Sequence, residues 1–131
     1  MSQQINTRVI SRLSGVDQSG ATALYGEDST GQYLMQMEDG SGNVIPATLD
    51  AIVTGVQMER PKNGIVCQIA VGEVVKIRLG DTVTLGTPAV CSDANGRAIP
   101  IASNHNVYGI VLTAGVVGDV VDVLVRPYYK S

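Results

Sequence analysis

The sequence predicts a mostly-β fold, a small β-barrel or β-sandwich with an extended N-terminal arm and at most one short helix. Two observations support this prediction. Turn residues alternate with short apolar runs through the C-terminal part of the chain, residues 72–127. Within it, residues 75–79 (VKIRL) alternate apolar and charged side chains, which is the period of a half-buried strand. Many short strands joined by tight turns are typical of small barrels and sandwiches.

Residues 1–31 are predicted to form an extended N-terminal arm or loop, and residues 32–131 a β-rich domain. Residues 14–31 are rich in Gly, Ser, Asp and Thr, and long segments without regular structure are usually functional or disordered. Two alternatives remain open for residues 7–13, whose apolar spacing suits a strand. They form either a mobile arm that becomes ordered on a partner or an edge strand of the domain.

The middle of the chain contains one ambiguous segment. Residues 33–37 favour a short strand that ends in the turn cluster EDGSGN at residues 38–43. Residues 46–58 combine a helical spacing of apolar side chains with a glycine and β-branched residues that favour a strand. Because Pro46 suits the first turn of a helix, we expect a short helix over residues 47–57.

Turn signals divide the rest of the chain into further strands. The Asn-Gly pair at residues 63–64 is a strong turn signal before an apolar strand at residues 65–71. The DANG sequence at residues 93–96 makes a further turn, because Asn and Gly accept positive φ. The Gly-Asp pair at residues 118–119 precedes a strand in which valines alternate with other side chains, residues 121–125. No internal repeat of the length found in solenoid proteins is visible.

The composition indicates one domain with a modest core. The 131 residues suffice for a single domain. Phe and Trp are absent, so Val, Ile, Leu and Ala must fill the core, and each buries less apolar area than an aromatic side chain. Burial of further apolar area between subunits would help, and we therefore expect an oligomer.

Charge and hydropathy exclude two classes of partner. The net charge is −3 with a pI near 4.9, and the basic residues are scattered, so we expect no nucleic-acid binding. No apolar stretch approaches the roughly 20 residues that cross a bilayer, so we expect no membrane partner. The polar N-terminus lacks the apolar core of a signal peptide, which predicts synthesis in a cytoplasm.

The residues that commonly bind metals are few and dispersed. His105 is the only histidine and lies in a polar turn, so we interpret it as a loop residue. Cys67 and Cys91 each lie within an apolar strand, which predicts two reduced, buried thiols. Because no second histidine accompanies these cysteines, the sequence predicts no zinc site, and it predicts no cofactor.

The sequence also lacks recognisable catalytic motifs. No serine occupies a G-x-S-x-G turn, and a single loop histidine is a poor activating base, so we expect a protein that is not an enzyme. Residues 74–90 (VVKIRLGDTVTLGTPAV) resemble the first half of a biotinyl or lipoyl carrier domain. Such carriers present a modifiable lysine at the tip of the next hairpin, but residues 92–98 here contain none.

A more extensive resemblance covers residues 64–126, about half of the chain. These residues resemble the capsid decoration (cement) proteins of tailed bacteriophages. The shared motifs are G-D-x-V at residues 80–83, T-P-A-V-x-S-D-A-N-G-R-A at 87–98, Y-G-I-V-L at 108–112 and G-D-V-V-D-V-L-V at 118–125. They consist of turn and strand residues, and the first 60 residues lie outside the resemblance.

The resemblance implies a virion protein on the capsid exterior. Such a protein binds the major capsid protein, often as a homotrimer at a threefold position, and its N-terminal arm reaches neighbouring capsomers. We therefore expect a structural protein that binds and stabilises a viral shell. The alternative is a small β-barrel accessory or carrier-like domain of an enzyme system, which a covalent modification at Lys76 or another lysine would favour.

Two sets of residues follow as candidates for these contacts. The capsid-binding arm is predicted to use Ile5, Arg8, Val9, Ile10, Arg12 and Leu13. The two arginines would meet an acidic capsid surface, and the apolar residues would anchor the arm. The oligomer interface is predicted at Val107, Ile110, Val111, Leu112, Val116 and Val117. Residues 107–112 put apolar groups on both strand faces, and a strand inside one chain's core explains this pattern equally well.

Overall fold

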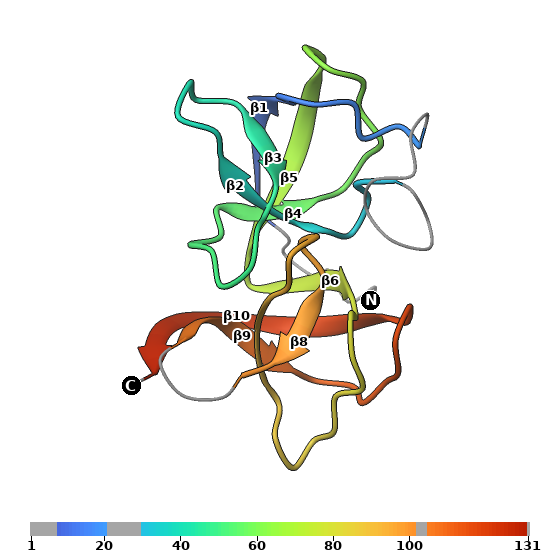
Figure 1. The fold of residues 1–131 in the computed structure, drawn as a ribbon, viewed down its shortest axis with the longest axis vertical. Coiled ribbons are helices and arrows are strands. Elements are labelled where there is room, and N and C mark those ends of the chain that lie inside the picture. The colour runs from blue at the N-terminus through green and yellow to red at the C-terminus, as the bar shows by residue number, and fades with distance from the viewer. Residues whose placement is uncertain (1–7, 21–29, 102–104, 131) are drawn as a thin grey trace, which may run out of the picture.

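The computed structural model describes residues 8–20, 30–101 and 105–130, and these form an all-β structure. Two antiparallel five-stranded sheets pack together as a small β-sandwich, one above the other in Figure 1, and neither closes into a barrel. The predicted fold class is confirmed. None of the described segments is helical, so this part of the chain holds no helix that is long and apolar enough to cross a membrane.

The two sheets divide the chain into an N-terminal and a C-terminal half. Sheet 1, in spatial order, consists of β1 (Arg8–Leu13), β5 (Val66–Gly72), β4 (Gly55–Gln57), β2 (Met35–Glu38) and β3 (Val44–Pro46). Sheet 2 consists of β6 (Val74–Arg78), β10 (Val120–Lys130), β9 (His105–Val111), β7 (Ala89–Ser92) and β8 (Ala98–Pro100). We call residues 8–72 unit 1 and residues 74–130 unit 2.

The two units have the same topology. Numbered from its own first strand, each sheet has the order first, fifth, fourth, second, third. In unit 1 the Ser14 amide donates to the Ile65 carbonyl at 3.0 Å, and in unit 2 the Leu79 amide donates to the Asp119 carbonyl at 2.8 Å. An isolated parallel bridge joins Ser14 to Val44, and its counterpart joins Leu79 to Ala98. The chain therefore contains an internal structural repeat, of which unit 1 and unit 2 are the two copies.

One turn of this repeat is also recognisable in the sequence, namely the turn between the second and third strands of each unit. Residues 39–46 and 93–100 share the pattern D-x-x-G-x-[VA]-I-P. In both turns the aspartate Oδ1 accepts two backbone amides, those of residues 41 and 43 in unit 1 and of residues 95 and 97 in unit 2. This local motif folds in the same way twice, and the sequence analysis missed it because the surrounding residues differ.

The expected helix over residues 47–57 is wrong. Asp50 has a φ of 56°, which a right-handed helix does not allow. The Thr54 amide donates to the Gln36 carbonyl at 2.8 Å, and residues 55–57 then form β4 between β2 and β5. Bonds to strands distant in sequence therefore override the local helical spacing.

The core lies between the sheets and is mainly apolar. Met35, Val56 and Ala70 of unit 1 belong to the same buried cluster as Ile77 and Val123 of unit 2. Alternate residues of each strand point into this cluster, as the period of two requires. Cys67 and Cys91 are free and buried, as the sequence predicted.

Within unit 1, buried glutamines replace the apolar residues of unit 2. Gln18, Gln36 and Gln57 are fully buried, and the topology gives them Val83, Val90 and Val111 as counterparts. The Gln18 Nε2 donates to Gln36 Oε1 at 2.9 Å, and the Gln36 Nε2 donates back to Gln18 Oε1 at 3.1 Å. The two side-chain amides thus satisfy each other in the interior of unit 1, as buried polar groups must.

Candidate functional site

Among the described residues, strand β1 is an edge strand of sheet 1. It pairs with β5 on one side, and on its other side β3 contacts only its C-terminal end, where Ser14 bridges Val44 and the Gly15 amide donates to the Val44 carbonyl at 2.8 Å. Since the Ser14 amide points toward β5, the alternation of an antiparallel ladder turns the backbone groups of Val9, Ser11 and Leu13 outward. An unpaired edge of this kind is a template for a strand from another chain.

The side chains of β1 and β5 make this edge apolar on one face. Val9 and Leu13 are each 42% exposed, and Val66, which pairs with Leu13, is 62% exposed. These three residues form the β1–β5 strip. The sequence analysis assigned residues 65–71 to a strand but did not select Val66, although its alternation with Cys67 placed it on the outer face.

The described residues of the predicted arm divide into a partly buried and an exposed group. Residues 8–13 form the edge strand, which is one of the two alternatives considered. Ile10 packs beside the buried cluster of Val44, Cys67 and Ile69, and the Arg12 Nε lies 3.8 Å from the Glu38 Oε1 of β2. Arg8, Val9 and Leu13 are exposed. Ile5, with residues 1–7 and 21–29 of the predicted arm, lies outside the described residues.

The corresponding edge in unit 2 is covered. The Arg78 amide at the end of β6 donates to the Tyr33 carbonyl at 2.9 Å. Arg78 corresponds to Leu13 in the repeat. Leu13 directly precedes Ser14, which bridges to Val44, and Arg78 directly precedes Leu79, which bridges to Ala98 in the same way. Among the described residues no loop makes the equivalent bond to Leu13. Within the described part of the chain, the β1 edge is therefore the more accessible of the two.

The predicted oligomer residues also divide into two groups. Val107 and Val111 are buried in the core of their own chain, because alternate residues of β9 point into the sandwich, so they cannot contribute to an interface in this fold. Ile110 is half-buried. Leu112, Val116 and Val117 are exposed. These three residues form what we call the 112–117 patch.

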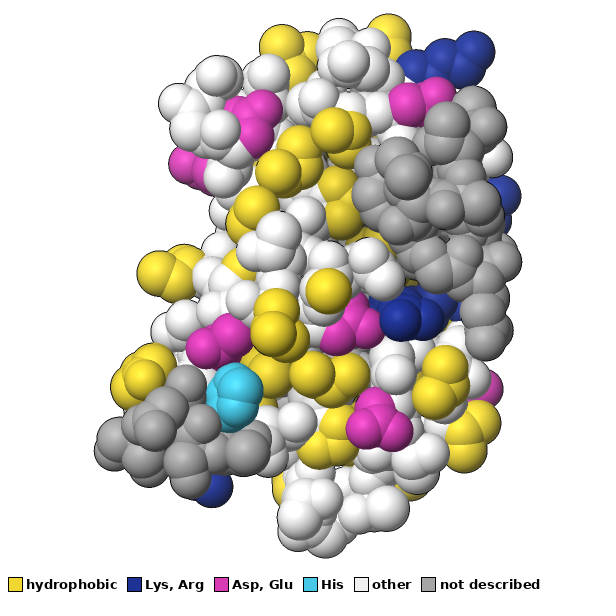
Figure 2. Space-filling model, in the orientation of Figure 1, with side chains coloured by type: hydrophobic (Ala, Val, Ile, Leu, Met, Phe, Trp, Pro, Cys, Tyr) yellow, Lys and Arg dark blue, Asp and Glu magenta, His cyan; other side chains and the backbone are white. Residues whose placement is uncertain are grey.

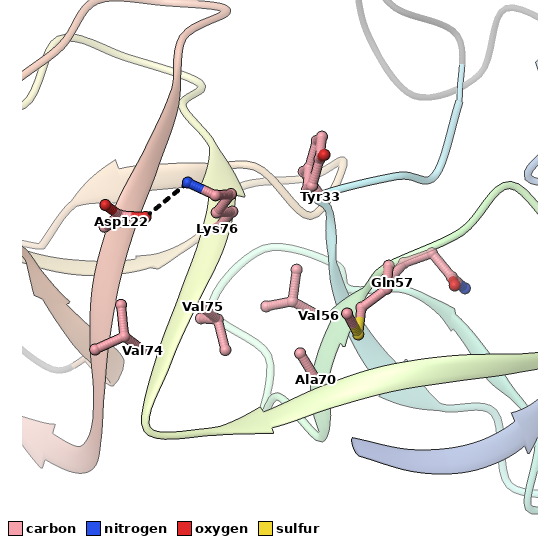
Figure 3. Close-up of a pocket in the computed structure, with 9 residues that line it drawn as sticks. Tyr33, Val56, Gln57, Ala70, Val74, Val75, Lys76 and Asp122 are labelled. Atoms are coloured by element: carbon pink, nitrogen blue, oxygen red, sulfur yellow. Dashed lines mark hydrogen bonds and ion pairs between the residues drawn. The ribbon is translucent and has the colours of Figure 1, made fainter. Parts of the chain in front are cut away.

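A groove of about 240 Å³ lies between the two units. Figure 3 shows Val56, Ala70 and Val75 along it. Lys76 also lines the groove, and its Nζ forms an ion pair with Asp122 Oδ1 at 3.0 Å. The lysine considered for carrier chemistry is thus paired across two strands and does not lie at a hairpin tip.

Three residues from distant parts of the chain gather at the boundary between the units. The His105 Nδ1 lies 3.2 Å from Asp50 Oδ1 and 3.9 Å from Cys91 Sγ. His105 begins β9, so its interpretation as a loop residue is wrong. Figure 2 shows the histidine at the surface in cyan, near the hydrophobic side chains that gather along the middle of this face. Sequence spacing gave no signal for this cluster.

The Cys91 thiol is held in its neutral form. Burial, and to a lesser extent repulsion of a thiolate by the nearby carboxylates of Asp50 and Asp93, raises its pKa to about 11. A cation between the thiol and the Asp50 carboxylate would reverse this balance, because it would favour both anionic forms.

Comparisons with known proteins add a structural likeness. No protein-family model matches the chain, and no curated protein matches its sequence. Among solved structures, the N base of the head fiber gp8.5 of bacteriophage phi29 has a similar fold. The superposition has a TM-score of 0.64 at 14% sequence identity, and it covers 91% of this chain and 95% of the other. The likeness therefore extends over both units, and at this identity it shows the fold alone.

Proposed function

We propose that this chain is a non-enzymatic structural protein of a bacteriophage virion that binds the outer surface of the capsid and stabilises it. The observation that carries the proposal is the likeness to a phage head fiber base over nearly the whole of both chains. The resemblance of residues 64–126 to phage decoration proteins points in the same direction. It rests on sequence motifs, so it is independent of the comparison of folds.

The β1 edge is the proposed contact with the major capsid protein. An extended capsid segment would pair with the outward backbone groups of Val9 and Ser11, which is β-strand addition. The β1–β5 strip would cover apolar side chains of that segment, and the exposed Arg8 would meet an acidic capsid surface. Each contact is small, but many copies on one shell would together resist its expansion.

Ser11→Pro is expected to weaken capsid binding by roughly fivefold to tenfold while the protein stays folded. Proline removes an amide that points away from β5, so the β1–β5 pairing survives, and proline is tolerated on edge strands. A lost backbone hydrogen bond contributes about 1 kcal/mol or slightly more, which corresponds to roughly fivefold to tenfold in affinity. Cosedimentation with the capsid of the virus that encodes the chain measures the effect.

Ser11→Ala is the matched control, because it removes the same hydroxyl but keeps the amide. It should bind as the wild type does. Electron microscopy of the same capsids should show the protein on the outer surface. Absence from that surface would refute the proposed function, whereas normal binding by Ser11→Pro would refute only the β1 contact.

We also propose that the protein binds as a homotrimer through the 112–117 patch. Val116→Asp is expected to convert the trimer to monomers, because each of three symmetric interfaces would gain a buried carboxylate. Val116 is 56% exposed in the single chain, so the substitution should leave the fold intact. Light scattering at micromolar concentration measures the mass. Ile52→Asp is the control and should leave the trimer unchanged, since Ile52 is exposed in another loop. A Val116→Asp protein that remains a trimer would contradict this interface.

The second candidate function is that of an accessory or carrier-like domain, which the groove between the units favours. Its apolar wall and the adjacent Lys76 would suit a small apolar ligand or a modified lysine. Mass spectrometry of the protein from its natural source tests this candidate through a covalent adduct at Lys76. Neighbouring genes for a biosynthetic pathway, instead of a portal, a protease and a major capsid protein, would also favour it.

A further inference from the structure

We propose that Asp50, Cys91 and His105 bind one zinc ion, which joins unit 1 to unit 2. Asp50 comes from the loop between β3 and β4 of unit 1, whereas Cys91 and His105 come from β7 and β9 of unit 2. One ligand atom of each residue lies within 4.8 Å of those of the other two. An ion at this point would therefore add a direct link between the two units.

The distances suit a tetrahedral zinc ion. Zinc binds nitrogen and oxygen at about 2.0–2.1 Å and sulfur at about 2.3 Å, so tetrahedral ligand atoms lie about 3.3 Å apart for N and O and about 3.6 Å apart for N and S. The His105 Nδ1 lies 3.2 Å from Asp50 Oδ1 and 3.9 Å from Cys91 Sγ. The ligand atoms of Asp50 and Cys91 lie within 4.8 Å of each other, so these two side chains would approach by at most about 1.2 Å to complete the site.

The loop that carries Asp50 is fixed by bonds that orient its carboxylate. The Asn106 amide donates to Asp50 Oδ1 at 2.7 Å, and the Asn106 Nδ2 donates to the Asp50 carbonyl at 2.9 Å. The Asp50 amide in turn donates to the carbonyl of Ser92, the residue after Cys91, at 2.9 Å. Asp50 also has a φ of 56°, and such backbone conformations persist where the surroundings impose them. Supporting bonds of this kind commonly orient metal ligands.

The ligand types select the class of ion. An Asp–His ion pair accounts for two of the residues but gives no reason for a thiol to approach the same imidazole nitrogen. A thiolate, an imidazole and a carboxylate together suit zinc, whereas calcium and magnesium prefer oxygen ligands alone. The side chains of Asp50 and His105 are 28% and 26% exposed, so a water molecule can take the fourth position. Cys91 would release its thiol proton to solvent on binding.

Metal titration of the full-length protein tests the site. The reduced, chelator-treated protein should bind one Zn²⁺ per chain, and its melting temperature should rise with Zn²⁺ concentration. Co²⁺ in place of Zn²⁺ should give a thiolate-to-cobalt charge-transfer band. Cys91→Ser and His105→Ala should each weaken binding by more than about 100-fold, beyond the loss typical of a supporting residue. Cys67→Ser, which removes the other buried thiol, should bind normally.

The outcomes separate a built site from an adventitious ion. Binding of one ion with unchanged affinity in both His105→Ala and Cys91→Ser would refute the site, as would a cobalt complex without the thiolate band. If Cys91→Ser fails to fold, the zinc affinity of His105→Ala tests the site instead. The His105 side chain is partly exposed, so its removal leaves the core intact. Retention of tight binding by that variant would overturn the proposal.

Discussion

Gly109→Ala is expected to destabilise the protein by more than about 3 kcal/mol. A Cβ at this position would press against the carbonyl oxygen of Leu124 and lie 2.8 Å from Val123 Cγ1. Both neighbours belong to β10, which pairs with β6 and β9 at once, so its backbone cannot retreat. Overpacking by side chains alone costs about 1–3 kcal/mol. A clash with the backbone of a central strand should exceed that range and consume most of a typical stability of about 5–15 kcal/mol.

Urea denaturation followed by circular dichroism measures this effect. Gly86→Ala is the matched control, because the nearest atom to its new Cβ, Thr84 Oγ1, lies 3.8 Å away. Gly55→Ala should behave like Gly109→Ala, since its Cβ would lie 2.5 Å from the Ala70 carbonyl oxygen at the equivalent place in unit 1. A Gly109→Ala protein with the wild-type midpoint would contradict the β9–β10 register.

Gln36→Met is expected to destabilise the protein by about 1–3 kcal/mol, the cost of leaving a buried polar group without its partner. Methionine has nearly the shape of glutamine, so the effect should come from the amide of Gln18, whose Oε1 loses the Gln36 Nε2 as its donor. The Gln18–Gln36 double substitution to methionine should be less destabilised than the sum of the two single substitutions. Unit 2 supports this expectation, because it places Val83 and Val90 at the equivalent positions.

A double-mutant cycle from urea denaturation measures the coupling between the two amides. Residues that share a hydrogen-bond network typically show interaction energies of about 0.5–3 kcal/mol. The pair Gln18→Met and Val90→Met is the control, because Gln18 lies in unit 1 and Val90 in β7 of unit 2, so the two should have additive effects. Additive effects for Gln18 and Gln36 would show that the reciprocal bonds contribute nothing to stability.

Local patterns were sufficient for the strands and turns. The alternation in residues 75–79 and 121–125 predicted β6 and part of β10, because side chains of a strand alternate between a buried and an exposed face. The turn at residues 93–96 was predicted because Asn and Gly tolerate positive φ, and Gly96 has a φ of 80°. The helix over residues 47–57 was wrong because its spacing is local, whereas the bonds that shape the segment come from Gln36 and Ser92.

The internal repeat was hidden for a different reason. The longest sequence pattern that both units share is the D-x-x-G-x-[VA]-I-P turn. At buried positions the two units use unlike residues, such as Gln36 and Val90, because each core needs only that its own polar atoms be satisfied and its own volume be filled. Topology and backbone bonds preserve the equivalence that side chains have lost.

The sequence by itself determined the β class, the main turns and the burial of both cysteines, because these depend on residues that are neighbours in the chain. Only the tertiary structure decided that β1 is an open edge, that Val107 and Val111 face the core, and that Asp50 meets His105. These features depend on how strands pair, and the bonds that place Asp50 join it to Asn106, 56 positions further along the chain. Contacts over such separations form when apolar faces from both halves of the chain are buried together, and no local pattern specifies them.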